Sequence, residues 1–117
     1  MENTQAVSAL SALAHDGRLE IFRLLVRTGQ AGMAAGEIGK TMGVLPNTLS
    51  GNLNILNAAG LVSSRRVGRS IIYKAGYDRM RELLTFLVED CCDSRPEICE
   101  PLFESVNNYG EDRASCC

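Results

Sequence analysis

The segment EIGKTMGVLPNTLSGNLNILNAAGLV, residues 37–62, carries two helical patterns separated by a tight break. In the first pattern, Ile38 and Met42 lie about one turn apart and are expected to face inward. Gly43 then ends this short helix, because glycine readily takes the backbone angles of a helix end. Pro46 opens the second pattern, since a proline in the first helical turn gives up no hydrogen bond. Two short helices joined in this way are typical of a helix-turn-helix.

The second helix of this segment has two contrasting faces. Leucines at i, i+4 and i+7 predict its buried face: Leu49, Leu53 and Leu56. The opposite face is small, polar and free of acidic residues, and consists of Asn47, Ser50, Gly51 and Asn54. Gly60 is expected to end the helix.

A basic hairpin is expected directly after this helix. The stretches LVSSRR (61–66) and RSIIYKA (69–75) are rich in β-branched and aromatic residues, and Val67–Gly68 supplies the turn between them. From Pro46 to Ala75 the chain has no acidic residue and four basic ones, which are Arg65, Arg66, Arg69 and Lys74. A polyanion would therefore be attracted to this part of the chain.

Two amphipathic helices are expected before the segment. Apolar residues mark the first one: Val7, Leu10, Leu13 and Ala14. This helix should stop at the sequence HDG, where Gly17 would take a left-handed turn. The second helix has a broader apolar face, made of Leu19, Phe22, Leu24, Leu25 and Val26. Gly29 and Gly32 are expected to close it.

A longer helix follows the hairpin, over YDRMRELLTFLVEDCC (77–92). Its apolar stripe comprises Met80, Leu83, Leu84, Leu87 and Val88. Asp78 favours the N-terminus, and Pro96 forbids a regular continuation past about Arg95. The complete order of elements predicts a mainly α fold with a β-hairpin wing, which is a winged helix-turn-helix.

Length and composition favour one small domain in the cytoplasm. A chain of 117 residues suits a single core, with the domain over 1–92 and an acidic, cysteine-containing tail over 93–117. The net charge of −2 conceals ten acidic residues against four arginines within 76–117. No apolar run is long enough to span a membrane, and the N-terminus lacks the pattern of a signal peptide. Five cysteines in a reducing compartment are then expected to be ligands, sensors or small apolar residues rather than disulfides.

Three stretches make the chain similar to the ArsR/SmtB family of bacterial metal-responsive repressors: LAHDGRLEIFRLL (13–25), the segment 37–62 and SRRVGRSIIYKA (64–75). The end of the second helix in the segment fits the family pattern at Leu53, Leu56, Ala59, Gly60, Leu61 and Val62. The resemblance covers roughly residues 5–90. It implies a homodimer built from the first and last helices that binds double-stranded operator DNA. It further implies that the helix from Pro46 enters the major groove and that the wing lies on the backbone.

The candidate DNA contacts fall on this helix and on the wing. Side chains suited to base edges are Asn47, Thr48, Ser50 and Asn54. Side chains suited to phosphates or to the minor groove are Arg65, Arg66 and Arg69. The alternatives are a merely solvated helix face and a hairpin edge kept soluble by charge. Relatives often carry a larger or basic residue followed by His where this chain has Gly51–Asn52, which puts a contact from those two positions in doubt.

The resemblance also directs attention to the thiols. Family members with a cysteine box on the third helix have it at positions that are Ala34 and Gly36 here, and members with a histidine-rich zinc site have no match because His15 is the sole imidazole. His15 is expected to cap a helix or to lie in an interface. Some arsenite-responsive members resemble this chain in having a Cys-Cys pair and a later Cys at the end of the last helix. The resemblance thus implies a metal site at Cys91, Cys92 and Cys99.

The chemistry of three thiolates suits As(III) or Sb(III) as an inducer, with no organic cofactor. Cys91 continues the stripe of Leu84 and Leu87, while Cys92 lies about 100° further round the helix. One ion can therefore bind both thiols only if the helix unwinds, and residues 93–96 are expected to provide that exit.

Several alternatives to this inducer remain open. Another soft metal (Cd, Cu or Zn), thiol oxidation, or cysteines that are merely packed would each account for the same residues. The terminal pair Cys116 and Cys117 is a possible accessory site. A thiol-dependent reductase is a remote alternative, because acidic neighbours disfavour a reactive thiolate. The chain is not expected to be an enzyme.

Overall fold

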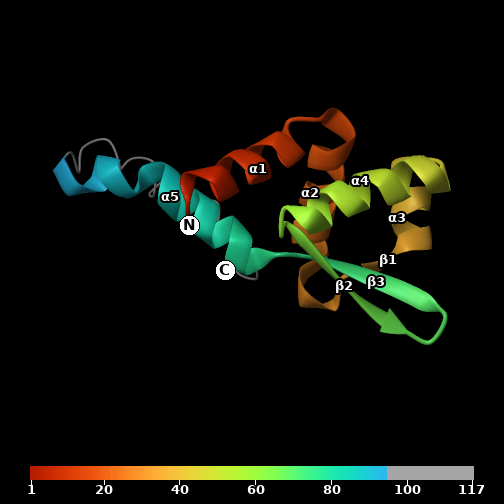
Figure 1. Cartoon of the computed structure of the whole chain (residues 1–117). Coiled ribbons are helices and arrows are strands. Elements are labelled where there is room, and N and C mark those ends of the chain that lie inside the picture. Colours follow the sequence, from red (N-terminus) through yellow and green to blue (C-terminus); the bar gives the residue numbers. More distant parts are fainter. Residues whose placement is uncertain (95–117) are drawn as a thin grey trace. The chain divides into compact units, whose positions relative to one another are not determined.

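A computed structural model describes residues 1–94 of the chain, with side chains described up to Val88. The predicted class is confirmed, because the chain forms helices with a small three-stranded antiparallel sheet (Figure 1). In chain order the elements are α1 (Asn3–Leu13), α2 (Asp16–Thr28), the 3-10 turn η1 (Gly29–Ala31), β1 (Met33–Ala34), α3 (Ala35–Met42), α4 (Pro46–Ala58), β2 (Val62–Val67), β3 (Ser70–Ala75) and α5 (Tyr77–Ser94).

The sheet has the order β1-β3-β2, and its two long strands form the wing. Figure 1 shows this hairpin extending away from α2, α3 and α4. Its turn is Gly68–Arg69, one residue later than predicted, because Val67 still pairs with Ser70. Gly68 has a φ of 61°, as two-residue hairpin turns require at their first position. The two-residue strand β1 was not predicted, since so short a strand gives no periodic signal.

The core lies between α2, α3, α4 and the base of the hairpin. Its large, fully buried side chains are Ile21, Leu25, Ile38, Leu53, Leu56, Leu61 and Val62. Each such side chain stabilises the fold by roughly 1.5–3 kcal/mol relative to an exposed one. The predicted inward positions of α3 and α4 are thereby confirmed at Ile38, Leu53 and Leu56.

The first helix turns small residues inward and leaves part of its apolar stripe exposed. Its buried residues are Ala6, Ala9 and Ala12, whereas Val7 and Leu10 are 56% and 43% exposed. Small side chains let α1 pack closely on α2 and α4. The larger apolar residues are left on the outside of this unit.

Two details predicted for α2 are wrong. Gly17 does not take a left-handed turn but lies in the first turn of α2, where the His15 ring and the Asn52 amide leave little room for a Cβ. The helix instead begins directly after its N-cap residue His15, whose Nδ1 accepts a hydrogen bond from the Arg18 backbone N–H at 3.3 Å. Leu19 is exposed rather than inward, and Ile21 takes the buried place. The prediction that His15 is a capping residue is confirmed.

The start of α5 is fixed to the end of α2. The Tyr77 hydroxyl donates a hydrogen bond to the carbonyl oxygen of Val26 at 3.1 Å. Just before it, Gly76 donates its backbone N–H to the carbonyl oxygen of Leu61 at 2.7 Å. The contacts of the chain define two units, residues 1–83 and 84–117, which divide within α5. Cys99, Cys116, Cys117 and all of the predicted tail beyond Ser94 lie outside the described residues.

Gly76 offers a test of this packing. Its Cβ, if present, would overlap the backbone carbonyl oxygen of Gly60, which cannot move aside as a side chain can. We therefore expect Gly76→Ala to lower the free energy of unfolding by roughly 1–3 kcal/mol. Urea unfolding at one fixed protein concentration, followed by circular dichroism, measures the change.

Gly51→Ala is the matched control. Gly51 lies in the middle of α4, is exposed, and has nothing within 4 Å of the position that a Cβ would take. The same substitution should there raise the free energy of unfolding by about 0.5–1 kcal/mol, because alanine loses less backbone entropy in a helix. Equal stability of the Gly76→Ala protein and the wild type would contradict the close approach.

Candidate nucleic-acid interface

The core fixes the rotation of α4 about its own axis. Leu49, Leu53 and Leu56 are at most 5% exposed and point into the unit. As a consequence, the four predicted base-contacting residues are all exposed on the outer side: Asn47, Thr48, Ser50 and Asn54. The structure therefore brings these four side chains to one surface, as the spacing predicted.

The two positions that depart from the family pattern have separate explanations. Asn52 is buried, at 8% exposure, and its Nδ2 lies 3.4 Å from the position that a Cβ of Gly17 would take. It therefore faces the first turn of α2 and does not belong to the outer surface. Gly51 is on that surface but has no side chain, so the backbone in the middle of α4 is directly accessible there.

The first turn of α4 also lacks acidic side chains. Leu45 occupies the N-cap position and makes no side-chain hydrogen bond there. Pro46 follows at the start of the helix, as predicted. Leu45 was not singled out from the sequence, and its side chain is 75% exposed.

The register of the wing separates its arginines. Arg65 pairs with Ile72 and Arg66 pairs with Ile71, and residues directly opposite in antiparallel strands lie on the same face of the sheet. Arg66 consequently shares its face with Ile71 and, two residues on, with Tyr73. Arg65 points to the opposite face.

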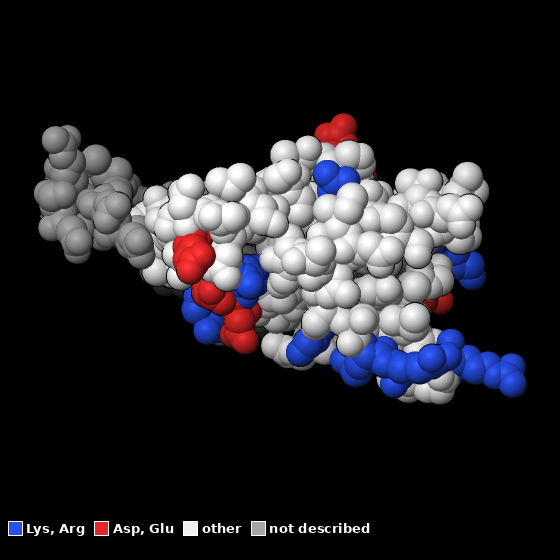
Figure 2. Space-filling model, viewed as in Figure 1, with Lys and Arg blue, Asp and Glu red and all other residues white. Residues whose placement is uncertain are grey.

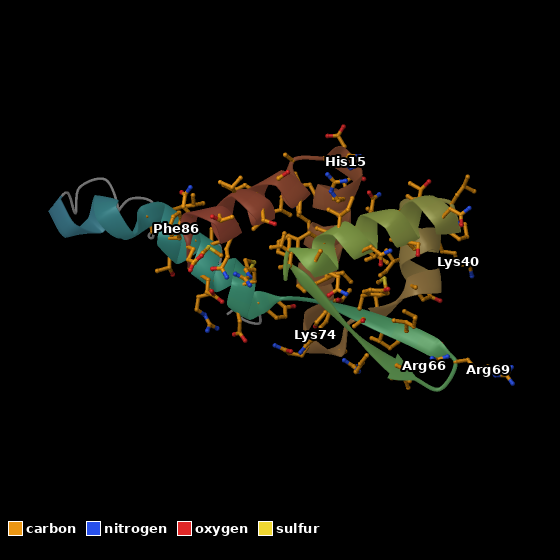
Figure 3. All side chains as sticks on the ribbon, in the orientation of Figure 1. His15, Lys40, Arg66, Arg69, Lys74 and Phe86 are labelled. Carbon is orange, nitrogen blue, oxygen red and sulfur yellow. The ribbon has the colours of Figure 1, made fainter. Side chains whose placement is uncertain are left out.

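The residues on that opposite face bind the turn η1. The Arg65 guanidinium donates to the carbonyl oxygen of Ala31 at 3.0 Å, and Lys74 Nζ donates to Gln30 Oε1 at 3.1 Å. In Figure 3, Lys74 lies near the base of the hairpin, whereas Arg66 and Arg69 lie toward its tip. Among the described residues, Arg66 donates only to the carbonyl oxygen of Gly68 in its own turn, at 3.4 Å. Arg66 and Arg69 are thus the wing arginines that extend outward.

Positive charge gathers over the hairpin in the space-filling view (Figure 2). The basic residues of the hairpin are the predicted ones, Arg65, Arg66, Arg69 and Lys74. The exposed polar face of α4 and this positive wing belong to the same unit, residues 1–83. The cationic hairpin suits the phosphates of a nucleic acid, and the neutral polar surface of α4 beside it suits hydrogen bonds to base edges.

A groove of about 580 Å³ runs between α3, the first half of α4 and the wing strand β3. Leucines of α4 form part of its lining, together with Leu45, Ile71 and Tyr73. Glycines on α3 keep it open, and one of them, Gly36, has free space where a Cβ would be. Among the described residues that line the groove, Lys40 is the only charged one. Lys40 was not among the residues singled out from the sequence.

The predicted metal site is described only in part. Cys91 and Cys92 lie in α5, which remains helical through Ser94, so the expected exit from the helix at Asp93 and Ser94 is wrong. The side chains of these two cysteines lie outside the described part of the chain. Within residues 1–88, whose side chains are described, no three His, Cys, Asp or Glu residues gather in a way that would hold a metal ion.

Comparisons with known proteins identify relatives that are helix-turn-helix proteins and transcriptional regulators. Residues 13–65 match the family model described as a helix-turn-helix domain. The biofilm growth-associated repressor of Agrobacterium fabrum is 30% identical over 89 residues, which are 76% of this chain and 74% of that protein. No helix of the described residues is long and apolar enough to cross a membrane.

Two solved structures are similar throughout most of the chain. One is the homodimeric winged helix-turn-helix DNA-binding domain of a possible ArsR-family regulator from Mycobacterium bovis, with 34% identity, a TM-score of 0.60, and coverage of 80% of this chain and 83% of that one. The other is an ArsR-like transcriptional regulator from Rhodococcus sp. RHA1, with 27% identity, a TM-score of 0.69, and coverage of 83% and 89%.

The fold and the exposed surfaces of α4 and the wing define a winged helix-turn-helix regulator of the DNA-binding class. Within that class, the chain belongs to the ArsR family of transcriptional regulators.

Proposed function

We propose that this protein is a transcriptional repressor that binds operator DNA as a homodimer and leaves it when As(III) or Sb(III) binds Cys91, Cys92 and Cys99. In this proposal α4 lies in the major groove, and the wing contacts the DNA backbone. The observation that carries the DNA-binding part is the exposed, acid-free face of α4 beside a hairpin with outward-pointing arginines.

Each part of this surface has a separate role in the proposal. The side chains of Asn47 and Asn54 suit adenine edges, and Thr48 and Ser50 suit several bases. Arg66 and Arg69 contact phosphates from the wing. Arg65 remains a predicted contact, but its contribution is smaller because its guanidinium already donates to Ala31. The open surface at Gly51 lets the backbone of α4 approach the DNA closely.

Two observations support the homodimer. The similar M. bovis domain is homodimeric. In this chain, α1 leaves Val7 and Leu10 exposed, and α5 leaves Leu84 and Leu87 exposed, at 56% and 52%. Exposed apolar residues in rows along helices are typical of helix-to-helix interfaces. Operators with two half-sites would match this symmetry.

The inducer part of the proposal rests on the donor set. Three soft thiolates suit As(III) or Sb(III) better than tetrahedral Zn(II), which takes four ligands. Neighbouring residues on a helix point about 100° apart, so the last turn of α5 must rearrange for Cys91 and Cys92 to share one ion. That rearrangement would couple the site to the apolar residues of α5 and hence to the dimer. Another soft metal or thiol oxidation is the alternative.

Salt provides the first test. Binding to operator DNA should weaken steeply as salt rises, with a slope of about −0.9 for each phosphate contact. Arg66→Ala or Arg69→Ala removes two contacts from a dimer and should reduce the slope by about 1.8. Fluorescence anisotropy with labelled operator, between about 50 and 200 mM salt, measures it.

Arg65→Ala is the comparison variant and should change the slope less, since Arg65 bonds to η1. Binding that does not depend on salt would refute the wing contacts. A larger slope change for Arg65→Ala than for Arg66→Ala would reverse the assigned roles.

Release by arsenite provides the second test. Titration of the operator complex with arsenite, antimonite, cadmium and zinc should release DNA most readily with the first two. Cys91→Ser, Cys92→Ser and Cys99→Ser should bind DNA as the wild type does but respond poorly, while removal of Cys116 and Cys117 should have little effect.

The coupling is also reciprocal, so DNA must weaken arsenite binding by the factor by which arsenite weakens DNA binding. A wild-type complex that never responds to arsenite would exclude this inducer. A Cys99→Ser protein that responds normally would exclude Cys99 as a ligand.

A further inference from the structure

We infer that Leu45 contacts the 5-methyl group of thymine at the operator, so that an apolar side chain at the start of α4 contributes to sequence recognition. This inference rests on the proposed DNA-binding function. The inference goes beyond that function by naming one residue and the base that this residue contacts.

Leu45 is the most exposed of the large apolar residues described, at 75%. It immediately precedes Pro46, at the end of α4 that in helix-turn-helix proteins meets base edges. A leucine in this place buries little within its own chain. Its exposed methyl groups are therefore available to a partner.

Leu45 also occupies the N-cap position of α4, where a leucine is unfavourable. The N-cap of a helix normally carries Ser, Thr, Asp or Asn, whose side chain accepts a hydrogen bond from the first turn. Leu45 makes no such bond. The position is thus unfavourable twice in the free protein, once for the exposed apolar surface and once for the missing cap. Departures of this kind without an internal compensation are expected at functional sites.

The groove beside Leu45 indicates what kind of partner fits. Leu45 lies at the α4 side of the groove, and Ile71, 43% exposed, lies on its wing side. Ile71 is paired with Arg66 and shares its face of the hairpin. The charged lining is Lys40, with no acidic side chain among the described residues that form the groove. Figure 3 shows Lys40 on α3 and Arg66 on the wing.

This combination favours DNA as the occupant. Cationic side chains at the borders suit phosphates, and an apolar contact in the major groove has one natural target, because thymine alone of the four bases presents a methyl group there. An acidic peptide would satisfy the lysine and arginine but would give Leu45 no defined contact. Double-stranded DNA satisfies both.

The test compares thymine with uracil, which lacks only this methyl group. Full-length wild-type protein first selects duplexes from a random library, and the enriched duplexes are then prepared with thymine or with uracil throughout. We expect uracil to weaken wild-type binding roughly tenfold, as the loss of about one buried methyl contact in each half-site would. For Leu45→Ala, affinity for thymine DNA should fall by a similar factor, and the difference between the two DNAs should largely vanish.

Two variants control the comparison. Leu45→Met keeps an apolar side chain and should retain most of the thymine preference. Leu19→Ala removes a 43% exposed leucine from α2 and should retain all of it. Thermal unfolding of Leu45→Ala should match the wild type, because the side chain packs against little within the chain.

Each result decides the matter. If Leu45→Ala keeps the full thymine preference, the inference is wrong while the DNA-binding function stands. If Leu45→Ala changes the oligomeric state in sedimentation, Leu45 belongs to a protein interface and the inference is wrong again. If the wild type enriches no DNA, the proposed function fails and the inference fails with it.

Discussion

The burial of one row of leucines on α4 is the constraint on which the rest of the surface depends. Leu49, Leu53 and Leu56 can enter the core in only one rotation of the helix, and that rotation places every polar candidate outward. Asn52 follows the same rule, because it lies three residues after Leu49 and four before Leu56, on the same side of α4, and so approaches the start of α2. The orientation of the recognition surface is therefore a consequence of core packing.

Periodicity predicted most of the fold because the helices here are long enough to repeat. The inward residues of α3 and α4, the hairpin and the glycine ends at Gly43 and Gly60 all follow from spacing and turn chemistry. Spacing did not show which residues of α1 form its contact with the rest of the unit. In α1 the alanines pack inward and the larger Val7 and Leu10 stay outside, because close helix contact favours small side chains over hydrophobic ones.

The surface was predictable in composition but not in detail. Sequence placed four polar residues on α4 correctly, yet it treated the arginines of the wing as equivalent. Their separation depends on the pairing of Arg65 with Ile72, and on the turn η1 lying within reach of the guanidinium, both of which are properties of the folded chain. Leu45 escaped notice for a similar reason. A leucine indicates a binding surface only when its side chain is known to be exposed, and the sequence pattern does not give that exposure. The expected exit at Asp93 failed because Pro96 restricts only its immediate neighbour, which leaves Ser94 free to stay helical.

The bonds from Arg65 and Lys74 to η1 have a mechanical consequence. They join the wing to the connection that follows α2, and the N-terminal part of α5 is in turn held to α2 through Tyr77. Because α4 also packs on α2, the wing and α4 are both held by α2 and the turn that follows it. In the proposed homodimer, the distance and angle between the two copies are then the part of the assembly that remains adjustable.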